Sequence, residues 1–184
     1  MFSEEKVTQM AAYFLLQSNR QMPYIKLMKL LYLSDRITLG QRGKSMSGDL
    51  FVSMPHGPVL SQTYDLIKGC GEPEHPWQCT IKDEANYDVS LVDGFDFDDL
   101  DELSRADVRI LDSVFSEFGQ MKPFELVDYS HEHCDEWRDP NGSSFPIKPE
   151  AIFRALGKNE EQVTSLLEKY REEQALDEVR AVLR

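Results

Sequence analysis

The stretch YIKLMKLLYLSDR, residues 24–36, decides the fold. Its apolar side chains point to most sides of a helix, whereas a surface helix confines them to one stripe. They are Leu27, Met28, Leu30, Leu31 and Leu33. We therefore predict a central helix, buried on several sides, that runs from residue 24 to about residue 39 and ends at Gly40.

Apolar residues at helical spacing predict further helices on both sides of this one. Capping residues support two of them: Ser3 ahead of the first helix, and Ser104 with Asp107 ahead of a helix that ends at Gly119. Helices are expected at about 4–18, 58–68, 104–119, 123–133, 150–156 and 159–183. A short strand is expected over 49–54, and alternating residues predict a β-hairpin from 77–82 and 87–92.

The predicted fold class is mainly α, a compact helical domain with a small β-hairpin and a C-terminal helical extension. The chain has no internal repeat and no long linker, so residues 1–157 are predicted to form one domain. Residues 158–184 form the extension, which packs on the domain or on a partner. Apolar spacing shifts near residues 172–174, which predicts a kink or a distinct final segment.

The composition of the chain bounds the kinds of partner it can have. Its 184 residues include 33 Asp and Glu but only 20 Lys and Arg, which gives a formal net charge of −13. Nucleic-acid binding draws most of its affinity from neutralised phosphates, so we expect no nucleic-acid partner. The acidity favours encounter with a basic protein, and solubility alone is an equal explanation.

The sequence also bears on where the protein works. Its longest apolar runs are too short to cross a bilayer, and its acidic first residues do not suit a signal peptide. The three cysteines are odd in number and widely spaced, as expected for reduced thiols. We expect a cytoplasmic protein with no membrane partner.

The segment SHEHCDEW, residues 130–137, gathers the side chains best suited to metal binding, which are His131, His133 and Cys134. On a helix His131 and Cys134 share a face, but His133 does not. The chain also lacks a Gly-x-Ser-x-Gly elbow and a phosphate-binding loop. We therefore predict no catalytic residue, no metal and no cofactor.

Three segments hold polar or aromatic residues that core packing alone does not explain. They are the leucine-rich helix at 24–36, the turn MPHGPV at 54–59, and SHEHCDEW. Turn and capping chemistry is one explanation for them, and a binding surface is another. A third explanation is a small hydrolase that acts through Asp35, His56 and His131, which requires these side chains to meet in one pocket.

Four blocks of the sequence together resemble the Panacea-domain family of SocA-like antitoxins. They are KLMKLLYLSDR at 26–36, the pair Gly48-Asp49, MPHGPVLSQTYD at 54–65 and SHEHCDEW at 130–137. The blocks match the family in order and spacing, and the resemblance covers roughly residues 2–153. One departure is His133-Cys134-Asp135, where family members tend to have an acidic residue and a proline.

The resemblance implies a helical domain that neutralises a toxin protein encoded by an adjacent gene. We expect inhibition by direct binding; the alternatives are an adaptor that delivers the toxin to a cellular protease, or a phage-derived scaffold. Aromatic and charged residues dominate protein interfaces of this kind. The candidate partner-binding residues are Tyr24, Lys26, Lys29, Asp35, Arg36, His56, Tyr64, His131, Glu132 and Trp137. The toxin and the oligomeric state are left open.

Overall fold

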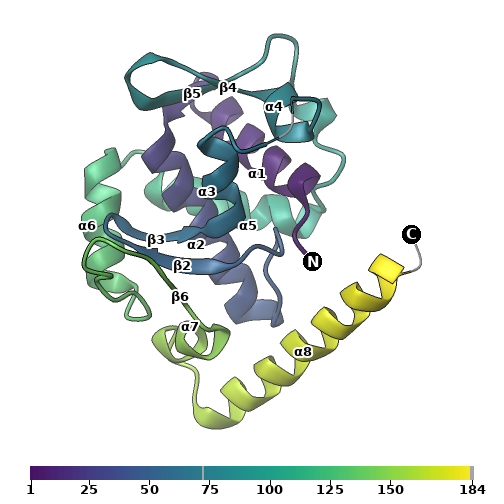
Figure 1. The fold of residues 1–184 in the computed structure, drawn as a ribbon, viewed down its shortest axis with the longest axis vertical. Helices are drawn as coiled ribbons and strands as arrows, with labels where there is room; N and C mark the ends of the chain where they lie inside the picture. Colours follow the sequence, from purple (N-terminus) through teal and green to yellow (C-terminus); the bar gives the residue numbers. More distant parts are fainter. Residues whose placement is uncertain (72, 183–184) are drawn as a thin grey trace.

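Helix α2 (Tyr24–Arg42) is the centre of the fold, as its sequence predicts. The computed structural model describes residues 1–71 and 73–182, and within these ranges α2 contacts α1, α5, α6 and α7 (Figure 1). The helix is longer than predicted. It continues past Gly40 and ends at Gly43, whose left-handed backbone (φ 76°) allows the chain to turn away.

Seven further α-helices surround α2 within the described ranges, which confirms the mainly α fold class. Their predicted caps are present as well: the Ser3 hydroxyl accepts a hydrogen bond from the Lys6 amide, and Ser104 and Asp107 form a capping box. The helices are α1 (Glu4–Gln17), α3 (Ser61–Ile67), α4 (Pro76–Thr80), α5 (Arg105–Phe118), α6 (Pro123–His133), α7 (Pro149–Ala155) and α8 (Glu160–Val182), with short 3-10 helices η1 (Ala85–Tyr87) and η2 (Phe97–Asp99).

Two small antiparallel sheets lie against this helical core. The first contains the predicted hairpin and the second contains the strand predicted over 49–54. Each sheet also gains a short third strand, β1 or β6, that pairs with residues far away in the sequence. The first sheet has the order β1 (Gln21–Pro23), β5 (Asp88–Leu91), β4 (Ile81–Asp83), and the second the order β3 (Gly57–Leu60), β2 (Phe51–Met54), β6 (Phe145–Pro146).

Two further predicted boundaries are wrong, and both involve a proline. Residues 57–60 were expected to open a helix at Pro58, but they form β3, and α3 begins only at Ser61. Pro58 is tolerated there because β3 is an edge strand. Trp77 was expected in a strand, but it belongs to α4, since Pro76 fits the first turn of a helix.

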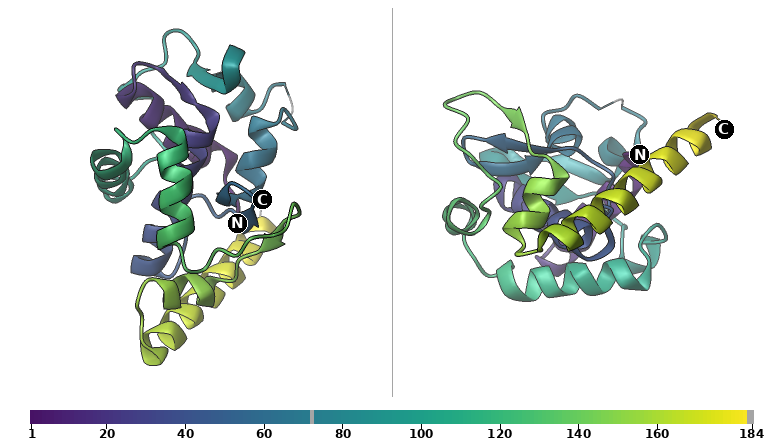
Figure 2. Two further views of the ribbon diagram at one scale, coloured as in Figure 1. Left: turned by 90° about the vertical axis from the view of Figure 1, so that its left-hand side faces the viewer. Right: turned by 90° about the horizontal axis from the view of Figure 1, so that it is seen from below.

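The C-terminal helix α8 is one uninterrupted helix, so the predicted kink near residues 172–174 is wrong. Its first half packs on α7 and α2 (Figures 1 and 2). Leu176, Val179 and Val182 near its end are exposed. From residue 173 onward α8 makes polar contacts with the rest of the chain, as in the pairs of Lys44 with Glu173 and of the N-terminal amine with Asp177. Among residues 1–71 and 73–182, none of the helices combines the length and apolar character needed to cross a membrane.

A buried carboxylate joins three helices beside the core. Asp107, at the start of α5, pairs with Lys6 of α1 at 2.9 Å and with Arg42 of α2 at 2.8 Å. Burial on its own raises the pKa of Asp107, but hydrogen bonds from Lys6, Ser104 and Arg42 outweigh it and lower that pKa to about 2. The folded protein therefore holds the ionised form of Asp107 more strongly than the unfolded chain does.

This pKa predicts an acid-sensitive contribution to stability. Because the pKa of Asp107 is lower in the folded state, its contribution is complete above about pH 4 and is lost as the pH falls towards 2. The loss amounts to about 2 kcal/mol. Urea unfolding at several acidic pH values should show a shallower pH dependence for Asp107→Asn than for the wild type. Glu132→Gln, at an exposed position on α6, should keep the wild-type slope.

Candidate protein-binding site

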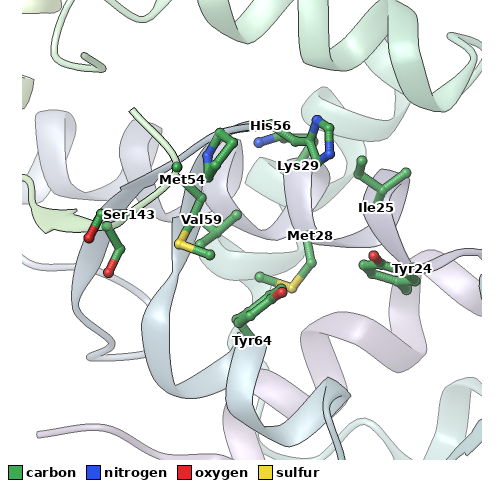
Figure 3. A pocket seen from close by; sticks show the side chains of 12 residues that line it. Tyr24, Ile25, Met28, Lys29, Met54, His56, Val59, Tyr64 and Ser143 are labelled. Atoms are coloured by element: carbon green, nitrogen blue, oxygen red, sulfur yellow. The ribbon is translucent and has the colours of Figure 1, made fainter. Parts of the chain in front are cut away.

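A cavity of about 380 Å³ opens between α2, the β2–β3 hairpin, α3 and the loop before β6 (Figure 3). Its walls are largely apolar, with Met28 from α2 and Met54 and Val59 from the two strands. This size and lining are typical of sites that bind a small molecule or an inserted side chain. The complete lining is Tyr24, Ile25, Met28, Lys29, Met54, Pro55, His56, Val59, Tyr64, Gly142, Ser143 and Ser144.

The charge of this lining differs from that of the chain as a whole. None of the twelve residues is Asp or Glu, although the chain contains 33 of them. The two basic side chains in the lining are Lys29 and His56. The lining of the cavity therefore has no acidic side chain, although the chain as a whole is strongly acidic.

Aromatic rings line the cavity and lie next to it. Tyr24 and Tyr64 belong to the lining, and the ammonium of Lys68 lies over both rings at 5.3 and 5.5 Å. Tyr87 is 78% exposed and lies 6.1 Å from the ring of Tyr24. We use the term "pocket face" for the cavity together with Tyr87 and Phe124, which is 64% exposed and 6.4 Å from the ring of His56.

Lys29 is the most deeply buried charged residue of the cavity, with 1% of its surface exposed. Its ammonium donates to the carbonyl oxygen of Pro58 at 2.9 Å, behind the hairpin turn. Gly57 makes this approach possible, since a Cβ atom there would collide with Lys29 Nζ and Ser130 Oγ. Burial lowers the pKa of Lys29 to about 7.

Trp137 and His131 support the hairpin from the side of α6. The indole Nε1 of Trp137 donates to the carbonyl oxygen of Met54 at 2.9 Å, and the ring of His131 stacks on the indole at 4.0 Å. Among the described residues, His131 Nε2 is buried without a hydrogen-bond partner. Burial, with the nearby charge of Lys29, lowers the pKa of His131 and favours the neutral ring.

Arg36 and Asp35, two of the residues that the sequence singles out, lie outside the cavity and make internal contacts. Arg36 forms two hydrogen bonds to Glu136, at 2.6 and 3.0 Å, and Glu136 also accepts from the Tyr32 hydroxyl. Asp35 accepts from the amides of residues 46 and 47 and from the Ser47 hydroxyl, and burial raises its pKa to about 6. Both residues hold the fold together.

Residues 27–138 of the chain match the family model described as antitoxin SocA-like, Panacea domain. The match covers more than half of the sequence. The chain belongs to the Panacea-domain family of SocA-like antitoxins. No curated protein and no solved structure matched the chain. The matched range includes most of α2, the β2–β3 hairpin, α3 and α6, which contribute most of the pocket face.

The other predicted contact residues of this Panacea domain fall into three groups. Tyr24, Lys29, His56 and Tyr64 line the cavity, and His131 and Trp137 lie behind the hairpin. Lys26 and Glu132 lie elsewhere: Lys26 donates to the carbonyl oxygen of Gly119 at 2.6 Å, and Glu132 is exposed on α6.

The structure does not bring the predicted hydrolase residues together. His56 lines the cavity, whereas Asp35 is fully buried and is not part of the lining. The metal-binding candidates diverge as well, since His133 stacks on Tyr129 at 4.3 Å while His131 stacks on Trp137. Within residues 1–71 and 73–182, no three His, Cys, Asp or Glu side chains gather where they could hold a metal ion.

Several residues of the site cannot be singled out from the sequence. Met28, Met54 and Val59 read as ordinary core residues, and their contribution to a cavity emerges only when α2 meets the hairpin. Phe124 follows a helix-starting proline, and nothing in its neighbourhood indicates that the ring is exposed. Glu136 lies in SHEHCDEW, but its partner Arg36 is a hundred positions away.

The unpartnered nitrogen of His131 leads to a prediction about stability. His131→Phe keeps a ring against Trp137 and removes a buried polar atom without a partner, so stability should stay equal or rise by up to about 1 kcal/mol. Thermal and urea unfolding will measure this. Trp137→Phe is the matched comparison and should be destabilising, because it loses the hydrogen bond to Met54. A clear loss of stability in His131→Phe would show that the imidazole nitrogen makes a bond in the folded protein.

Proposed function

We propose that this Panacea domain neutralises a toxin protein, encoded by an adjacent gene, by binding it directly through the pocket face. The observation that carries the proposal is a cavity without acidic residues, bordered by exposed aromatic rings, on a chain of net charge −13. Most of this face lies in the part of the chain that defines the family. The family description supports the antitoxin role in general terms, and the surface is our assignment.

An aromatic ring that stays exposed to water forgoes the free energy of burial. Tyr87 and Phe124 leave most of their apolar surface in water, although burial of such a ring is favourable by a few kcal/mol. Aromatic residues in this position are typical energetic centres of interfaces, because they gain burial and lose little side-chain entropy on binding. Their place beside a cavity gives a partner both a flat contact and an opening into which a side chain can insert.

The net charge supports the same function through the rate of encounter. A protein with a strong negative field attracts a basic partner before contact, which speeds association. The pocket face then supplies the desolvated contact while the acidic surroundings orient the partner. We propose that the bound antitoxin covers the active site of the toxin, in the cytoplasm where both proteins are made.

Co-expression with the adjacent open reading frame tests this function. We expect that frame to arrest growth when expressed alone, and co-expression with the antitoxin to restore growth and yield a complex that co-purifies. Rescue in a host lacking its main proteases separates direct neutralisation from delivery to a protease, because only the former persists there. A neighbouring gene that is not toxic, or rescue without a complex, would contradict the proposal.

A further inference from the structure

A second hollow lies beside the cavity and shares Tyr24 with it. It has a volume of about 560 Å³ and opens between the end of α3 and the turn that follows β4. Tyr87 of the pocket face belongs to it, so the hollow continues that face. We use the term "tyrosine groove" for it, and its lining is Tyr24, Ile67, Lys68, Asp83, Glu84, Asn86 and Tyr87.

The tyrosine groove has the acidic side chains that the cavity lacks. Asp83 and Glu84 are exposed neighbours at the end of β4. Among residues 1–71 and 73–182 neither carboxylate takes part in an ion pair. Glu84 accepts a hydrogen bond from the Ser90 hydroxyl at 2.7 Å. Carboxylates next to aromatic rings favour a cation, since the face of a ring also attracts positive charge.

A cation of the chain itself lies against these rings. The ammonium of Lys68 is 5.3 Å from the centre of the Tyr24 ring and 5.5 Å from that of Tyr64, which is the range of a cation–π contact. Lys68 is exposed, and a cation–π contact at an exposed site is weak. The two rings therefore accept a positive charge in the folded protein, from a side chain that another cation can replace.

We propose that the tyrosine groove binds an arginine side chain of the partner protein, in the place that Lys68 takes in the free protein. This inference rests on the proposed function, because the toxin supplies the arginine. A guanidinium is planar and stacks on aromatic rings, which Tyr24 and Tyr87 provide. Its N–H groups form two parallel hydrogen bonds to a carboxylate, which Asp83 or Glu84 provides. The cavity beside the groove then takes an apolar side chain of the same partner.

Two probes of matched shape test the groove on the isolated protein. Acetyl-argininamide and acetyl-citrullinamide differ in that citrulline has a neutral urea group in place of the guanidinium. NMR titration of the isotope-labelled protein at neutral pH gives both affinities and identifies the amides that shift. We expect the arginine probe to bind at least about threefold more tightly, because only this probe gains the cation–π contact and the charged hydrogen bonds. The shifts should gather at residues 67–68 and 83–87.

Two double variants separate the groove from the general negative charge of the chain. Asp83→Asn with Glu84→Gln should abolish the preference for arginine. Glu168→Gln with Glu172→Gln removes the same number of charges from α8 and should keep the preference. All four side chains are exposed, so both variants should fold, and thermal melting verifies this.

Lys68→Met tests the exchange of one cation for another. Loss of the ammonium frees the rings of Tyr24 and Tyr64, so this variant should bind the arginine probe at least about twofold more tightly than the wild type. Lys148→Met, at an exposed position outside the lining, should bind it as the wild type does.

Three results would overturn the proposal. They are equal affinities for the two probes in the wild type, a preference for arginine that survives Asp83→Asn with Glu84→Gln, and an affinity that Lys68→Met does not raise. None of these measurements uses the toxin. An antitoxin that rescues growth but shows no preference for the arginine probe would refute the arginine site alone. A protein that binds the arginine probe but has no toxic neighbour would refute the antitoxin function alone.

Discussion

Replacement of Arg36 by methionine is expected to lower the free energy of unfolding by about 3–5 kcal/mol. The reason is that the substitution leaves Glu136 buried without its ion-pair partner. Glu136 has a fully buried side chain, and among the described residues Arg36 is its one basic partner, through bonds of 2.6 and 3.0 Å. Without the guanidinium, Glu136 must either remain ionised in the core or take up a proton. Urea unfolding at neutral pH will measure the loss.

Two further variants separate charge from packing in this experiment. Adding Glu136→Gln to Arg36→Met removes the unpaired charge and keeps an acceptor for the Tyr32 hydroxyl, so it should restore part of the stability. Arg154→Met breaks a pair with Glu160 that is exposed on both sides and should leave the unfolding midpoint unchanged. If Arg36→Met folds as stably as the wild type, Arg36 would return to the candidates for partner contact.

Loss of the two exposed rings of the pocket face is expected to weaken toxin binding by about a hundredfold or more. Tyr87 and Phe124 flank the cavity through their contacts with Tyr24 and His56. If each is an energetic centre of the interface, the two alanine substitutions together cost roughly 3–4 kcal/mol of binding free energy. The double variant should fold normally, since both rings are mostly exposed, and it should fail to rescue growth.

Phe97→Ala provides the matched control for this prediction. Phe97 is 52% exposed on η2, outside the pocket face, so its loss removes an exposed aromatic ring without touching the proposed interface. Calorimetry with the purified toxin should give a wild-type affinity for this variant. A double variant that binds the toxin as tightly as the wild type would place the interface on another surface.

Much of the fold could be predicted because local chemistry determines it. The leucine-rich pattern of residues 24–36 and the capping residues at Ser3 and Ser104 act within one helix each, and α1, α2 and α5 form as expected. Strands β1 and β6 could not be predicted. Each has two or three residues and exists only because it pairs with β5 or β2, which are far away in the sequence.

The candidate site was predictable in part, for a similar reason. Polar residues in a buried helix indicate an internal polar contact or a binding surface, and this applies to both Lys29 and Arg36. The sequence does not reveal which of them meets an internal partner. Arg36 pairs with the carboxylate of Glu136, whereas Lys29 donates to the carbonyl oxygen of Pro58 beside the cavity, and both contacts join segments that are distant in the sequence.

Hydrogen exchange on the co-purified complex of antitoxin and toxin tests the central claim most directly. The turn at residues 55–57, the residues around η1 and the loop at 141–144 border the pocket face, and their amides should exchange more slowly in the complex. The acidic segment at 93–101 lies outside this face and should exchange as in the free protein. Protection confined to α8 or to residues 93–101, with the border of the cavity unchanged, would contradict the account.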